Sequence, residues 1–131
     1  MIKPRNVLLI IADQWRADCL GCAGNRVIMT PHLDGLAAEG TRFTSCFNQT
    51  APCGPSRMCI YTGRYLCSTR SAQNCTPLQD AEENFGFELR KAGYDPGLIG
   101  YNDYAIDPAI LPPDDFRTKS LHYANVLPGF E

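Results

Sequence analysis

The hydrophobic positions of the chain fall into short segments separated by turn-forming residues. An apolar run with β-branched members covers residues 6–12 (NVLLIIA), and it is short enough to favour a buried strand over a helix. Residues 41–48 (TRFTSCFN) alternate between apolar and polar side chains, and residues 97–101 (GLIGY) form another short apolar segment. We therefore predict three strands. Asp13 follows the first one, at the strand end where ligands collect in open α/β sheets.

Helical patterns occupy the intervals between these strands. One helix is predicted between Thr30 and Gly40, because Thr-Pro suits a helix start and glycine suits the position past its end. A second helix is predicted over residues 56–65. A third follows a cap-like acidic pattern at Asp80, continues along one apolar face and ends before Gly93.

The order of these elements predicts the fold class. Strands alternating with helices indicate an α/β layered fold with a mostly parallel sheet flanked by helices. Three strands are few for such a sheet, and residues 108–131 are rich in proline and aspartate without periodicity. We expect residues 1–131 to be part of a larger domain, with a core at about 5–107 and an irregular tail at 108–131.

Composition places few further limits. The 131 residues fit one compact domain, and 44% hydrophobic with 20% charged residues is ordinary for globular proteins. The formal net charge of −2 gives no support to a nucleic-acid or anionic-membrane partner. The apolar run after residue 6 is too short for a secretory signal or a membrane span, so the expected location is the cytoplasm.

The chain has seven cysteines, an odd number that cannot pair completely within one chain. Cys19 and Cys22 form a single C-x-x-C, and no second pair accompanies it. A redox or metal-binding protein built on these two residues stays open as an alternative. Most of the other cysteines are expected to be small buried apolar residues.

The chemically most informative segment is residues 53–57 (CGPSR), followed by residues 62–64 (TGR). Pro55 suits a helix start, and a group at a helix N-terminus is close to free N–H donors and the positive end of the dipole. Arg57, about one turn on, can reach back toward the same atoms, and its charged fork matches sulfate or phosphonate oxygens. The pattern thus combines a thiol near a helix start with a residue suited to binding anions.

These residues resemble the sulfatase signature C-x-P-S-R followed by T-G-R or T-G-K, in the alkaline phosphatase superfamily. The resemblance implies an alkaline-phosphatase-like sulfatase fold, incomplete at the C-terminus, and makes Cys53 and Arg57 catalytic. It also implies a partner, the formylglycine-generating enzyme, which reads the Cys, Pro and Arg and oxidises Cys53 to formylglycine. One hydroxyl of the hydrated aldehyde would attack the ester, and the second would expel the bound anion.

The resemblance also implies a divalent metal. The family's acidic residue after the first strand corresponds to Asp13, and the implied ligands are Asp13, Cys53 and Gln14. Oxygen ligands suit Ca²⁺, Mg²⁺ or Mn²⁺. Ordinary sulfatases have a second acid where Gln14 stands, whereas residues 13–18 (DQWRAD) resemble the phosphonate monoester hydrolase branch.

Two further positions resemble that branch and imply contacts with a small anionic ester. Asn74 would bind the substrate anion, and Tyr101 stands where many sulfatases have the lysine that holds sulfate. Asp103 stands where the branch has threonine, and we expect it to be a solvated loop acid. A sulfuric ester and a phosphonate or phosphate monoester both stay open as the substrate.

The family's remaining metal ligands and its acid and base residues come far downstream in longer chains. We therefore expect this chain alone to show no turnover. A catalytically inactive fragment, or an anion-binding remnant of the same fold, is the alternative to an enzyme segment. Self-association of a full-length protein stays open.

Overall fold

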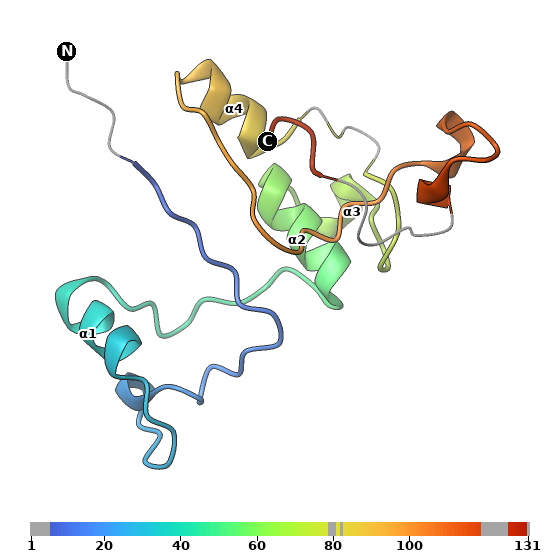
Figure 1. Ribbon diagram of the computed structural model, residues 1–131. Helices are drawn as coiled ribbons and strands as arrows, with labels where there is room; N and C mark the ends of the chain where they lie inside the picture. The colour runs from blue at the N-terminus through green and yellow to red at the C-terminus, as the bar shows by residue number, and fades with distance from the viewer. Residues whose placement is uncertain (1–5, 79–80, 82, 119–125, 131) are drawn as a thin grey trace. The chain divides into compact units, whose positions relative to one another are not determined.

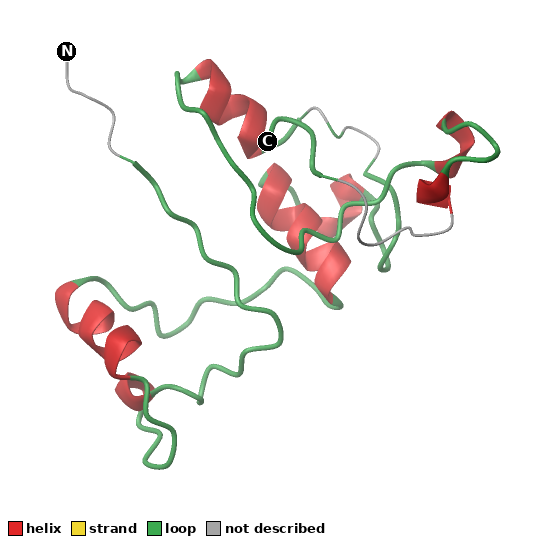
Figure 2. Ribbon diagram, in the orientation of Figure 1, coloured by secondary structure: helices red, strands yellow, loops and turns green. Residues whose placement is uncertain are grey.

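The computed structural model describes residues 6–78, 81, 83–118 and 126–130 of the chain. It divides into two compact units, Met1–Phe47 and Asn48–Glu131. Figures 1 and 2 show their helices. The first unit holds η1 (Gly21–Ala23) and α1 (Pro31–Glu39). The second holds α2 (Cys53–Thr62), α3 (Leu66–Thr69), α4 (Phe85–Lys91), η2 (Pro108–Ile110) and η3 (Phe116–Thr118).

Helix α1 begins and ends as the sequence predicts. Pro31 is its first residue, and the Gly40 N–H donates to the Leu36 carbonyl at 2.9 Å to end it. Thr30 precedes the helix without capping it, because its hydroxyl donates to Asp34 Oδ1 at 3.0 Å and accepts from the Gly21 N–H at 2.9 Å. These bonds attach η1 to α1.

The three predicted strands are not formed in the described part of the chain. Residues 6–12 and 97–101 carry no ladder, and residues 41–48 are interrupted by a bend. Leu8 is 83% exposed and its apolar neighbours are similarly open to solvent. A buried strand needs other strands to take its N–H and C=O groups and other layers to cover its faces. The mostly parallel sheet therefore stays a prediction.

The first unit has no buried residue among those the structure describes, and it is held by local hydrogen bonds. The buried positions all lie in the second unit. Its core surrounds α2, whose described neighbours include α3 and α4. The buried apolar side chains of this core are Met58, Cys59, Tyr61, Leu78, Tyr104, Ala105 and Leu127.

Helix α2 starts three residues earlier than predicted, at Cys53 rather than Ser56. Pro55 then lies in its first turn, where the missing N–H of a proline costs no helical hydrogen bond. Gly63 ends the helix in the left-handed conformation, with φ of 65°. The early start makes Cys53 the first helical residue, and this is the main consequence for the site.

Helix α4 has a different N-cap from the one predicted. Asp80 lies outside the described residues, and the observed cap is Asn84, whose Oδ1 accepts from the Gly86 N–H at 2.8 Å. Asparagine competes well with aspartate at this position because both present a short acceptor oxygen. Gly93 follows the helix with φ of 86°, as predicted for a glycine past a helix end.

The tail is less irregular than predicted. Two short helices, η2 and η3, lie within residues 108–118, and residues 126–130 pack back onto α4. Leu127 is fully buried, and the ring of Phe130 meets that of Phe85 edge-on at 5.2 Å. The Arg90 guanidinium donates to the Gly129 carbonyl at 2.7 Å. None of the described helices is both long and apolar enough to cross a membrane.

Candidate active site

Cys53 is half-buried at the first position of α2, and its thiol contacts the side chain of Asn74. The amide Nδ2 of Asn74 donates to Sγ at 3.4 Å, and Sγ can in turn donate to Oδ1 at 3.6 Å. Oδ1 also accepts from the backbone N–H of Gly54 at 2.9 Å. One side chain thus contacts both the thiol and an N–H at the start of the helix.

Arg57 lies one turn along the same helix and is only 5% exposed. Its Nη1 donates to the backbone carbonyl of Tyr101 at 2.9 Å, and its Cζ lies 5.0 Å from the centre of the Tyr101 ring. It also hydrogen-bonds to the hydroxyl of Tyr61. These contacts hold the guanidinium in one place, so it would lose little freedom on binding an anion.

Tyr101 connects Arg57 to the surroundings of Cys53. Burial, a hydrogen bond to Asp103, the charge of Asp103 and the neighbouring Cys53 together raise the pKa of the Tyr101 hydroxyl well above its usual range. The phenol therefore keeps its proton at neutral pH and can serve as a hydrogen-bond donor.

The expectation that Asp103 is a solvated loop acid is wrong. Asp103 is 3% exposed and adopts a left-handed backbone with φ of 60°. The preceding residue stabilises this turn, since Asn102 Oδ1 accepts from the Tyr104 N–H at 2.7 Å. Aspartate tolerates the left-handed region better than most residues. Asp103 is thus a site residue that sequence reasoning missed, although its place two residues after Tyr101 was a usable signal.

The structure therefore brings four predicted residues together in the second unit: Cys53, Arg57, Asn74 and Tyr101. The other two predicted ligands, Asp13 and Gln14, are exposed in the first unit. Within the described residues no group of three or more His, Cys, Asp or Glu side chains gathers to hold a metal ion. The metal site stays a prediction.

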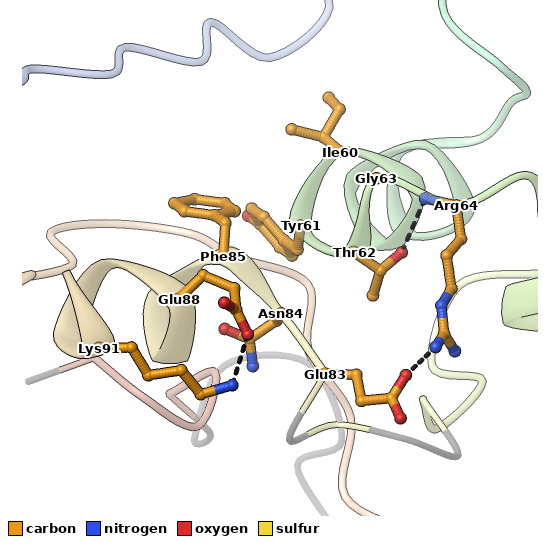
Figure 3. Close-up of a pocket in the computed structure, with 10 residues that line it drawn as sticks. All are labelled: Ile60, Tyr61, Thr62, Gly63, Arg64, Glu83, Asn84, Phe85, Glu88 and Lys91. Atoms are coloured by element: carbon orange, nitrogen blue, oxygen red, sulfur yellow. Dashed lines mark hydrogen bonds and ion pairs between the residues drawn. The ribbon is translucent and has the colours of Figure 1, made fainter.

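A hollow of about 550 Å³ lies at the other end of α2, and Figure 3 shows the side chains that line it. Two ion pairs lie among its lining residues, Arg64 with Glu83 and Lys91 with Glu88, and the second joins two residues of α4. A helix of ten residues is about 15 Å long. The hollow is thus separate from Cys53, and the T-G-R segment at its edge ends α2 through Gly63 and pairs Arg64 with an acid.

Residues 5–109 match the family profile described as Sulfatase, and the chain belongs to the sulfatase family. It is 40% identical to the multifunctional alkaline phosphatase superfamily protein PehA of Trinickia caryophylli, over 96% of this chain and 25% of that protein.

Two solved structures are similar as well. The phosphonate monoester hydrolase of Agrobacterium radiobacter matches with a TM-score of 0.81 and 43% identity, over 92% of this chain and 23% of that one. The phosphonate monoester hydrolase SpPMH from Silicibacter pomeroyi matches with a TM-score of 0.83 and 42% identity, over 98% and 25%.

These similarities confirm the fold class as that of alkaline-phosphatase-like sulfatases and phosphonate hydrolases. The two solved relatives are phosphonate monoester hydrolases by name. The chain spans about a quarter of the length of these first relatives.

Proposed function

We propose that this chain is the nucleophile-bearing segment of an ester hydrolase, in which Cys53 is oxidised to formylglycine. The observation that carries the proposal is the polar environment of the Cys53 thiol at the start of α2, where Asn74 contacts Sγ. Residues 53–57 keep the Cys, Pro and Arg that the modifying enzyme of this family reads. Membership of the sulfatase family supports the same proposal.

In this proposal the chain's own residues supply the nucleophile and two contacts for the substrate anion. A sulfuric ester or phosphonate monoester would place its anionic oxygens toward Arg57 and the amide of Asn74. One hydroxyl of the hydrated residue 53 attacks sulfur or phosphorus, and the ester alcohol leaves with a proton. The second hydroxyl then loses its proton, the carbon–oxygen bond to the bound group breaks, and the anion leaves as the aldehyde re-forms.

A divalent cation belongs to this proposal. The carboxylate of Asp13 and the amide oxygen of Gln14 are donors of the kind that Ca²⁺, Mg²⁺ or Mn²⁺ prefers. Such an ion, when bound, supplies positive charge that polarises the aldehyde hydrate. Two such ligands do not make a tight site for a hard cation. We therefore propose that further ligands come from sequence beyond these residues, and that this chain alone has no turnover.

For the substrate class, Gln14, Asn74 and Tyr101 favour a phosphonate monoester over a sulfuric ester. Both anions are tetrahedral and suit the same donors. Tyr101 keeps its proton and donates it in a hydrogen bond to Asp103, so this position carries no positive charge, whereas a lysine here would add a full charge. The buried Asp103 beside it adds a carboxylate to the site.

The test is aldehyde formation at residue 53 after co-expression with a formylglycine-generating enzyme. Peptides of the purified chain are treated with an aldehyde-reactive aminooxy probe and mapped by mass spectrometry. The probe is expected on the peptide that contains residue 53, to be lost in Cys53→Ala and to be kept in the matched control Cys46→Ser. If Cys53 is recovered only as a thiol while a known substrate of the enzyme is converted, the proposal fails.

A further inference from the structure

Gly54, directly after Cys53, occupies a position where a side chain has no room. A Cβ atom built there would lie 3.0 Å from Asn74 Oδ1, 3.0 Å from Asp103 Oδ2 and 3.1 Å from the Cα of Asn74. Contacts this close are rarely tolerated unless a neighbour moves. The helix itself does not require glycine, since the position has no left-handed backbone.

The neighbours of Gly54 are not free to move without loss. The Asn74 side chain is held by the Gly54 N–H at 2.9 Å and by the Cys53 thiol at 3.4 Å, so moving its Oδ1 disturbs both contacts. Asp103 is buried in a left-handed turn and bonded to the Tyr101 phenol. The space over Gly54 is thus already filled by two polar groups.

We propose that Gly54 is a positioning residue: its missing Cβ leaves the space in which Asn74 and Asp103 lie against the start of α2, and this space keeps the Asn74 amide on the side chain of residue 53. This inference rests on the proposed function in one respect, because it takes residue 53 as the residue that reacts with the substrate. Residue 54 is the variable position x of C-x-P-S-R. We infer that this position requires glycine when residue 103 is an acid.

The test uses the unmodified full chain, so it is independent of conversion to formylglycine. Alkylation of each thiol by iodoacetamide is followed by peptide mapping in the wild type, Gly54→Ala, Asn74→Ala and the double variant. The matched control is Gly35→Ala, inside α1, where an added Cβ meets nothing within 4 Å. The exposed Cys46 and Cys67 serve as internal references.

If Gly54 acts through Asn74, both single variants change the Cys53 rate in the same direction by about fivefold, the scale of one hydrogen bond. The double variant then shows no further change, while Gly35→Ala and the reference thiols keep the wild-type rates. A wild-type Cys53 rate in Gly54→Ala, or effects of the two substitutions that simply add, would overturn the proposal.

A second arm covers the case in which Gly54→Ala folds poorly. Asp103→Gly removes the carboxylate that the new methyl group would meet, and glycine suits the turn at φ of 60°. Asp103→Gly is expected to shift the urea midpoint to a higher concentration in the Gly54→Ala background than the shift it causes in the wild type would predict. An equal shift in both backgrounds would contradict a steric link between positions 54 and 103.

Discussion

Around Cys53, single side chains each serve several contacts at once. Asn74 contacts the thiol and a helix N–H, and Arg57 bonds to the Tyr101 carbonyl while lying over its ring. Removing one such side chain therefore breaks more than one interaction, and two predictions follow from this at the scale of the residue.

Arg57→Ala is expected to lower the free energy of unfolding by about 2 kcal/mol or more, because it leaves a buried carbonyl and phenol without their charged donor. Urea unfolding followed by circular dichroism measures the effect. The control is Arg42→Ala, at an exposed position, with an expected change within about 0.5 kcal/mol. Equal effects of the two substitutions would show that Arg57 is not held as described.

The raised pKa of Tyr101 predicts how the free energy of unfolding depends on pH in the alkaline range. Its pKa is raised in the folded chain, first by burial and then by Asp103. Up to the unfolded value of about 10, the contribution of Tyr101 is fully present. Above that value the unfolded chain loses the proton more readily, so stability falls as pH rises further.

Tyr101→Phe should flatten this alkaline loss, and Tyr65→Phe, at an exposed position, should not. Urea unfolding at several values of pH above neutrality measures both. An identical alkaline loss in the wild type and in Tyr101→Phe would argue against a raised pKa of the Tyr101 phenol in the folded chain.

The sequence predicts four residues of this site but not the burial of Asp103. The motif predicts Cys53 and Arg57, and the resemblance to the phosphonate monoester hydrolase branch predicts Asn74 and Tyr101. The structure brings the four residues together. For Asp103 the sequence predicts a solvent-exposed side chain, because a lone acid between turn residues usually is exposed. Its burial depends on a left-handed turn and on the missing Cβ of Gly54, and neither is visible in local sequence.

Among the elements, the three predicted helices are formed, whereas the three predicted strands are not formed in the described residues. The start and end of α1 follow from Pro31 and Gly40, which act through nearby backbone. A strand such as residues 6–12 needs partners that its own sequence does not contain. The alternation at residues 41–48 predicts which side chains share the apolar face of a strand. It does not provide the other element that would pack against this face.

Asn84 provides a prediction at this scale. It caps α4 and also donates to the Pro128 carbonyl at 2.9 Å. Asn84→Ala is expected to cost about 1 to 2 kcal/mol of unfolding free energy through the lost cap, and more through the lost Pro128 contact. The control is Asn48→Ala, at an exposed position. A loss no greater than that of the control in urea unfolding would remove Asn84 as the cap.

At the scale of the whole molecule, the two units differ in what stabilises them. The second unit has a core around α2, whereas the described part of the first has none. A unit without buried apolar groups gains little from the hydrophobic effect. Hydrogen exchange is therefore expected to be slow in α2 and fast in α1, and equal protection of the two helices would contradict this division.

Leu127 tests whether the end of the described chain belongs to that core. Because its side chain is fully buried, Leu127→Ala should cost about 3 kcal/mol in urea unfolding. The neighbouring Val126 is half-exposed, and Val126→Ala should cost much less. Similar losses from the two substitutions would place Leu127 outside the core.

This chain itself builds the polar surroundings of the Cys53 thiol, because Asn74 contacts both Sγ and the Gly54 N–H. The most direct measurement is disulfide formation between Cys53 and the thiol introduced by Asn74→Cys, mapped by mass spectrometry under mild oxidation. Rapid pairing with Cys53 is expected, since the Asn74 amide lies 3.4 Å from Sγ, and little pairing is expected for Gln73→Cys at the exposed neighbouring position. Equal pairing of both introduced thiols, or a preference of the Asn74→Cys thiol for Cys46 or Cys67, would contradict it.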